Sequence, residues 1–159
     1  MIRLKEDLKI DITEVNHLSN VVEHLDDLDF NKLLFFLDRN ENNFVQNKEH
    51  AFKLMNFQIF KQGQDFQTEV QKIYDYRGEK INTHIFASLS KKGISYCHHD
   101  EMSVFLIPTY GGVVYNIYTE TEQHIFLLKK GDLLTIPKGV VHSAIPLNPR
   151  IVVSVGVYN

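Results

Sequence analysis

Two short segments in the C-terminal half hold the residues best suited to chemistry. Segment 97–101 reads Cys-His-His-Asp-Glu, and segment 131–142 contains the pattern G-x5-P-x-G-x2-H. Because residues two apart in a strand share a face, His98 and Asp100 can bind one metal ion together. With His142 they make a set of two imidazoles and one carboxylate. Such a set leaves about three coordination positions open and suits non-haem Fe(II).

A second register is available in the first segment. Counting from Gly93, the pattern G-x5-H reaches His99. That register would make His99 and Glu101 the ligands. Neighbouring residues in a strand face opposite sides, so this pair and the pair of His98 and Asp100 cannot both bind the ion. The residues alone leave both registers open.

The fixed residues of the second segment have clear physical roles. Gly131 starts the turn into a strand, and Pro137 and Gly139 end that strand in a tight turn. The next strand then begins with His142 pointing inward. In this arrangement the segment resembles the second sequence motif of the cupin superfamily, whose barrels hold a metal.

The first segment differs from the common cupin pattern. Common cupins use H-x-H followed by a Glu near the position of Val104, and that Glu is absent here. The H-x-D that remains, with a Phe five residues beyond the Asp, resembles the Jumonji-C-like branch of the 2-oxoglutarate-dependent oxygenases. The residues in step with that branch are His98, Asp100, Phe105, Gly111 and His142. The resemblance covers roughly residues 81–157, and it favours the register with His98 and Asp100.

The resemblance implies a ligand set and a function. His98, Asp100 and His142 would hold Fe(II) or another divalent metal, and 2-oxoglutarate and O2 would take part in a hydroxylation. No catalytic residue beyond these metal ligands is expected, because the metal does the hard step. The substrate would be a small molecule or a protein that the sequence does not identify.

One position departs from the oxygenase pattern. The branch usually has a Lys or Arg two residues beyond Gly111, where it binds the distal carboxylate of 2-oxoglutarate, and this chain has Val113 there. An unpaired carboxylate in a desolvated pocket is costly, so another group would have to bind it. Arg150, which opens the last predicted strand, is one candidate. Tyr115, on the same strand face as Val113, could add a hydroxyl.

Two other functions stay open. Val113 favours a metal cupin that does not use 2-oxoglutarate, such as an isomerase or a cosubstrate-free dioxygenase. A non-catalytic small-molecule-binding cupin is the third alternative, and it requires no metal. The other histidines are expected on the surface or in hydrogen bonds; they are His17, His24, His50, His84 and His124.

Short β-type runs separated by turns follow residue 78. The predicted strands are 81–89, 94–98, 102–107, 113–118, 124–128, 132–136, 140–145 and 151–158. Strands at this regular spacing indicate a sandwich or a barrel. The cupin resemblance specifies a double-stranded β-helix, or jelly-roll, barrel. The expected fold class is mainly β, with N-terminal α-helices before the barrel.

The N-terminal half has a helical apolar period. Apolar residues at i, i+3, i+4 and i+7 form one stripe over residues 18–28, which predicts a helix. Further helices are predicted over 30–37 and 65–76, the latter with Asp65 as N-cap and Gly78 as its C-terminal stop. The stretch from 52 to 60 fits either a strand or a helix.

The 159 residues are the size of one domain, 1–159, with a mostly helical part at 1–78 and the barrel at 79–159. Apolar residues make up 43% and charged residues 23%, which excludes a disordered or fibrous protein. A single cysteine excludes an internal disulfide framework and predicts a cytoplasmic protein. A net charge of −3 gives no reason to expect nucleic acid, and no apolar run approaches the roughly 18 residues of a membrane span. A homodimer is expected only by analogy with other cupin-like barrels.

Overall fold

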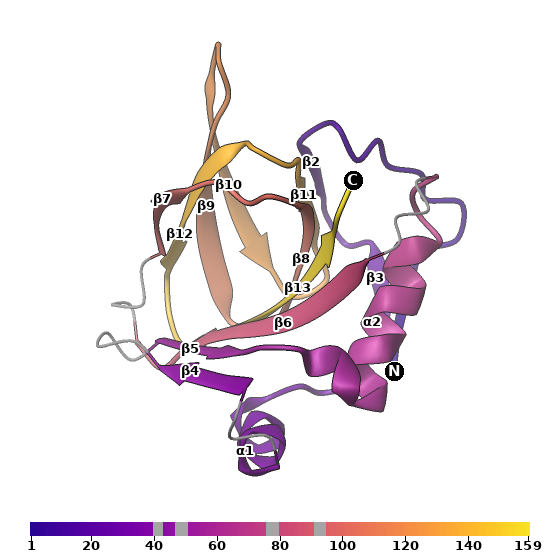
Figure 1. Ribbon diagram of the computed structural model, residues 1–159, viewed down its shortest axis with the longest axis vertical. Helices are drawn as coiled ribbons and strands as arrows, with labels where there is room; N and C mark the ends of the chain where they lie inside the picture. Colours follow the sequence, from indigo (N-terminus) through magenta and orange to yellow (C-terminus); the bar gives the residue numbers. More distant parts are fainter. Residues whose placement is uncertain (40–42, 47–50, 76–79, 91–94) are drawn as a thin grey trace.

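Eight strands in the C-terminal half form a barrel of two facing sheets (Figure 1). The computed structural model describes residues 1–39, 43–46, 51–75, 80–90 and 95–159. The strands are β6 (Ile81–Ser88), β7 (Ser95–His98), β8 (Ser103–Tyr110), β9 (Gly112–Tyr118), β10 (Gln123–Lys129), β11 (Leu133–Ile136), β12 (Val141–Pro146) and β13 (Arg150–Val157). Each lies at a segment predicted from the sequence, and the predicted start of β7 at Ile94 is outside the described residues.

The chain alternates between the two sheets except at β9 and β10, which form a hairpin within the smaller sheet, and this is the strand order of a double-stranded β-helix. Strands β6, β8, β11 and β13 belong to the larger sheet, whose order is β2-β11-β8-β13-β6-β5-β4. Strands β7, β9, β10 and β12 form the smaller sheet in the order β10-β9-β12-β7. Neighbouring strands in both sheets are antiparallel. The predicted jelly-roll barrel is confirmed.

Side chains of the larger sheet alternate between the barrel interior and a second core outside it. On β8, Val104 and Leu106 belong to the interior core, whereas Phe105 and Ile107 belong to the outer one. The interior core consists of Val104, Leu106, Val113, Tyr115, Ile117, Leu128, Leu134, Ile136, Ala144 and Val152. Every residue of β13 is buried, because both faces of this central strand are covered.

The N-terminal part is less helical than the sequence pattern predicts. Its elements are β1 (Ile2–Leu4), β2 (Asn16–Leu18), β3 (Val22–Leu25), α1 (Phe30–Asp38), β4 (Phe44–Gln46), β5 (Ala51–Leu54), the 3-10 turn η2 (Phe57–Ile59) and α2 (Lys61–Gln71). The expected helix over 18–28 is wrong. The chain is largely extended there because Leu18 pairs with Leu133 of β11. The N–H of Val21 also donates to the Gly131 carbonyl, so tertiary pairing overrides the helical period.

Helix α1 lies where the sequence predicts it, one residue longer than the expected 30–37. Asp29 caps its N-terminus by accepting a hydrogen bond from the Lys32 N–H. The described part of the chain contains no helix that is long and apolar enough to cross a membrane.

Helix α2 begins four residues before the predicted N-cap Asp65, because η2 leads directly into it. Gly63 permits this close approach, since a Cβ at that position would lie 2.2 Å from the Phe57 carbonyl oxygen. The stretch 52–60, which fitted either element, contains the end of β5 followed by η2. The predicted stop at Gly78 lies outside the described residues.

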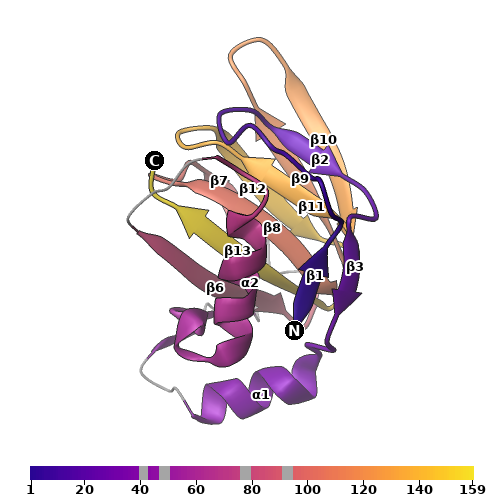
Figure 2. The same cartoon turned by 90° about the vertical axis from the view of Figure 1, so that its right-hand side faces the viewer.

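Helix α2 and strand β1 lie over the outer face of the larger sheet (Figure 2). Helix α2 packs against β6 and β13. Phe105 lies in the core beneath this layer, fully buried, with its ring stacked on Tyr74 at a centroid distance of 5.3 Å. One of the five residues that match the oxygenase branch therefore serves packing and does not face the barrel interior.

Replacing Phe105 with alanine tests this placement. We expect the free energy of unfolding to fall by about 3–5 kcal/mol, because the change removes a fully buried ring and leaves a cavity. Urea unfolding measures the loss. The folded fraction should bind metal with the same stoichiometry as the wild type; a variant of normal stability that no longer binds metal would contradict the assignment.

Candidate metal centre

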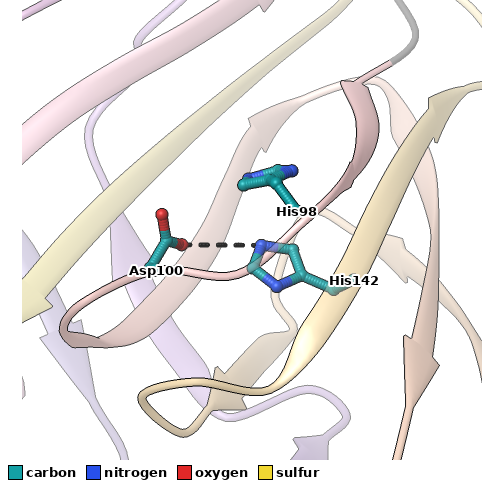
Figure 3. Close-up of side chains that lie close together, drawn as sticks. All are labelled: His98, Asp100 and His142. Carbon is teal, nitrogen blue, oxygen red and sulfur yellow. Dashed lines mark ion pairs between the residues drawn. The ribbon is translucent and has the colours of Figure 1, made fainter.

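Two histidines on neighbouring strands of the smaller sheet lie side by side on the same face. His98 is the last residue of β7 and His142 the second residue of β12, and the antiparallel pairing of these strands makes them direct partners. Cross-strand partners project on the same face, and the two ring centroids are 4.4 Å apart. Asp100 follows two residues after His98 and points at the same place (Figure 3). One ligand atom from each of the three lies within 4.8 Å of the others.

Hydrogen bonds hold both imidazoles in one orientation. Nδ1 of His98 lies 2.7 Å from the carbonyl oxygen of Tyr96, and Nδ1 of His142 lies 2.9 Å from that of Val140. A carbonyl only accepts, so each Nδ1 carries the proton and donates it. The lone pair of each neutral ring is therefore on Nε2. A second nitrogen held by a backbone carbonyl is the usual support of a metal-binding histidine.

The turn that ends β11 holds the aspartate segment in place. The N–H of Gly139 donates to the carbonyl of Asp100 at 2.9 Å, and the N–H of Lys138 donates to the Ser103 hydroxyl at 3.1 Å. Gly139 has a φ of +78°, a left-handed conformation that favours glycine. The glycine of the second motif thus connects the two segments that carry the candidate ligands.

The three side chains differ in exposure. His142 is buried, Asp100 is half-buried and His98 is exposed. Burial lowers the pKa of His142, while its hydrogen bond to Val140 acts in the opposite direction. The neutral ring, which is the form that binds metal, is therefore favoured. Nε2 of His142 lies 3.5 Å from a carboxylate oxygen of Asp100.

The alternative register is not compatible with this geometry. His99 and Glu101 are exposed and pair with each other at 3.6 Å, outside the cluster of three. Gly93, from which that register is counted, lies outside the described residues. The structure brings together the set with His98 and Asp100. Their assignment as ligands stays a prediction.

A cavity of about 250 Å³ lies beside the cluster inside the barrel. Arg150, Tyr115 and Ser154 line it together with the three candidate ligands. Arg150 is buried at the start of β13 and donates a hydrogen bond to the Tyr115 hydroxyl. Burial raises the pKa of Tyr115, and the charge of Arg150 opposes the rise. Val113 is fully buried in the interior core and does not line the cavity.

Two further cavity residues, Lys53 and His84, were not predicted. Segment 52–60 fitted two elements, so the sequence could not say which way Lys53 points. His84 was expected on the surface or in a hydrogen bond, and it does accept one from the Asn56 N–H. Its alternation with Phe86 along β6 is the signal that could have placed it on the inner face. His50 lies outside the described residues.

We expect His84 to make the free energy of unfolding depend on pH. Burial lowers its pKa from 6.5 to about 4; the charge of Lys53 acts in the same direction and that of Asp100 opposes it. Between pH 6.5 and 4 the unfolded chain binds this proton and the folded chain does not, so the free energy of unfolding falls as the pH falls through that window. His84→Asn, which keeps an acceptor for the Asn56 N–H, should flatten the slope. Urea unfolding of metal-free protein at several pH values measures it, and equal slopes would contradict the prediction.

Comparisons with known proteins place the fold. No family model matches the chain, and no curated protein matches it either. Among solved structures, YcfD, a ribosomal oxygenase from Escherichia coli in complex with cobalt and 2-oxoglutarate, is 15% identical with a TM-score of 0.75. The match covers 99% of this chain and 53% of YcfD, so the chain spans about half the length of that relative.

Two further solved structures with a similar fold identify the type of barrel. A variant of oxalate decarboxylase from Bacillus subtilis is 15% identical over 74% of this chain and 28% of that one, with a TM-score of 0.55. Vicilin from Capsicum annuum is 13% identical over 73% of this chain and 30% of that one, with a TM-score of 0.56. The chain has the cupin fold. Within that fold, the candidate metal centre and its cavity lie where the two cupin sheets face each other, and identities this low leave the activity to be tested.

Proposed function

We propose that this cupin is an Fe(II)- and 2-oxoglutarate-dependent oxygenase that hydroxylates an organic substrate. The observation that carries the proposal is the convergence of His98, Asp100 and His142 at the cavity, with both imidazoles presenting Nε2. Two histidines and one carboxylate with open positions are typical of non-haem Fe(II) oxygenases. The likeness to YcfD, whose structure contains cobalt and 2-oxoglutarate, supports it.

The donor set fits a divalent ion. Two ligand atoms that each lie about 2.0–2.2 Å from one ion are at most about 4.4 Å apart. Nε2 of His142 and the nearer oxygen of Asp100 are 3.5 Å apart, inside that limit. The ligand atoms of the cluster lie within 4.8 Å of one another, and three donors on one face of an ion are about 3 Å apart, so the side chains would have to move closer together around a bound ion.

In the proposed reaction the chain binds the ion and orients the cosubstrate. When bound, Fe(II) supplies the redox chemistry that couples O2 and the decarboxylation of 2-oxoglutarate to hydroxylation of a C–H bond, with succinate and CO2 as the other products. Arg150 and Tyr115 bind the distal carboxylate, in place of the basic residue that Val113 replaces. Both line the cavity, and Arg150 is already oriented by its hydrogen bond to Tyr115.

Anaerobic titration of the Fe(II)-loaded protein with 2-oxoglutarate tests the proposal. Chelation of the iron by the oxo acid should produce a charge-transfer absorption band that saturates at one equivalent. Succinate, which lacks the oxo group, is the matched control and should give no band. A protein that binds one Fe(II) and shows no band with 2-oxoglutarate is not this kind of oxygenase.

A second candidate is a metal cupin that does not use 2-oxoglutarate. Val113, fully buried and apolar at the position where the oxygenase branch has a cation, is the observation in its favour. This candidate predicts that the protein binds one metal ion and gives no band in the titration. The same experiment therefore separates the two.

A further inference from the structure

Two basic side chains of the cavity, Lys53 and His84, have no part in the proposed binding of metal or cosubstrate. They come from the neighbouring strands β5 and β6. Lys53 pairs with Phe86 across these strands, and His84 lies two residues from Phe86, so both side chains are on the sheet face that lines the cavity. Lys53 Nζ lies 5.0 Å from the centroid of the Phe86 ring.

His84 presents a fixed hydrogen-bond donor to the cavity. It is only 8% exposed, and its Nδ1 accepts a hydrogen bond from the Asn56 N–H at 3.1 Å. In a neutral ring whose Nδ1 accepts, the proton is on Nε2. The lowered pKa of about 4 keeps the ring neutral at pH 7. Since His84 lines the cavity, its Nε2–H is available to an acceptor bound there.

Lys53 adds a cation beside this donor. In the described ranges of the chain, no carboxylate lies within 4.0 Å of its Nζ. Burial lowers the pKa of Lys53, and the charge of Asp100 partly opposes this. A half-buried ammonium without an ion-pair partner is costly. A bound anion would offset that cost and hydrogen-bond to both side chains.

The charges of the residues that line the cavity predict the net charge of this anion. The lining contains two cations, Lys53 and Arg150, and Asp100 as its one carboxylate among the described residues. With a divalent ion and doubly charged 2-oxoglutarate bound, the charges of the ion, Asp100, Arg150 and the cosubstrate cancel. Lys53 then keeps one positive charge, which favours a second ligand with one negative charge and disfavours a cationic one.

We propose that Lys53 and His84 form an oxyanion subsite that binds the carboxylate of a small organic acid, the substrate that the oxygenase hydroxylates. This inference names a substrate class and rests on the proposed function, but the subsite itself is tested without metal. It also predicts that lysine- or arginine-like molecules are excluded, because Lys53 repels them.

Titration of the metal-free full-length chain with benzoate and benzamidine tests the subsite, because the two probes have the same shape and opposite charge. We expect benzoate to bind at least about tenfold more tightly than benzamidine, as measured by calorimetry. Lys53→Met should weaken benzoate binding roughly tenfold or more, which is the loss expected for one charge-assisted hydrogen bond. Tighter binding of benzamidine, or unchanged benzoate binding in the variant, would overturn the proposal.

Lys80→Met is the matched control. Lys80 also lies over an aromatic ring, 4.9 Å from the centroid of Tyr158, but it is exposed and does not line the cavity. We expect this variant to bind benzoate like the wild type. A loss as large as that of Lys53→Met would show a general charge effect and overturn the proposal.

A second measurement separates this inference from the function on which it rests. Lys53→Met loaded with Co(II) should bind 2-oxoglutarate within about threefold of the wild type. If it loses that binding, Lys53 belongs to the cosubstrate site; the subsite proposal is then wrong and the oxygenase stands. If the wild type binds benzoate through Lys53 but gives no 2-oxoglutarate band, the oxygenase is wrong and the anion subsite stands.

Discussion

Replacing His142 with alanine is expected to abolish stoichiometric binding of Co(II) or Fe(II). His142 is the buried member of the cluster, and its Nε2 faces Asp100. Removal of a residue that only supports a ligand already costs roughly 10–100-fold in metal affinity. Removal of the ligand itself should cost more than that. The Co(II) absorption spectrum and calorimetric titration measure the loss, and circular dichroism shows whether the barrel is intact.

His99→Ala is the control for this prediction. His99 is adjacent to the cluster in sequence, yet it is exposed and pairs with Glu101 outside the cluster. Its replacement should leave metal stoichiometry and affinity unchanged. If His142→Ala keeps one equivalent of metal, or if His99→Ala loses it, the ligand set of His98, Asp100 and His142 is wrong.

Replacing Arg150 with methionine is expected to weaken the binding of 2-oxoglutarate and to leave the binding of metal unchanged. This is the second largest effect that we expect. Arg150 is buried, lines the cavity and hydrogen-bonds to Tyr115. Truncating one partner of a buried, hydrogen-bonded charge pair costs about 2–5 kcal/mol, which is a loss of affinity of roughly 30-fold or more. Methionine keeps most of the side-chain volume, so the cavity wall is preserved. The anaerobic titration of the Fe(II) protein measures the change.

Metal binding by the same variant is its internal control. Arg150 is not in the metal cluster, so Arg150→Met should still bind one Fe(II). Tyr115→Phe removes only a hydroxyl and should weaken 2-oxoglutarate binding by about 1 kcal/mol, close to fivefold. Undiminished binding of 2-oxoglutarate by Arg150→Met would exclude this arginine as the anchor that replaces the family's basic residue.

Much of the barrel could be predicted because its signals are local. Each strand from β6 to β13 is a short β-type run between turn residues, and turn chemistry acts over a few positions. The N-terminal part was less predictable for the opposite reason. The apolar stripe over 18–28 has a helical period, but partners more than a hundred residues away, Leu133 and Gly131, hold part of it in an extended conformation. Such distant partners leave no trace in the local pattern.

The candidate metal centre was likewise predicted only in part from the sequence. The sequence by itself determined only the candidate ligand types, because β7 ends at His98 and Asp100 lies beyond it, so the strand-face argument that joined these two residues does not apply. Only the tertiary structure brought the three candidate side chains together, because the pairing of β7 with β12 places His142 opposite His98, while His99 pairs with Glu101 outside the cluster. It also brought Lys53 to the cavity beside His84. The position of Lys53 follows from the pairing of strand β5 with β6, and a pairing between segments that are apart in the sequence is set by the packing of the whole chain.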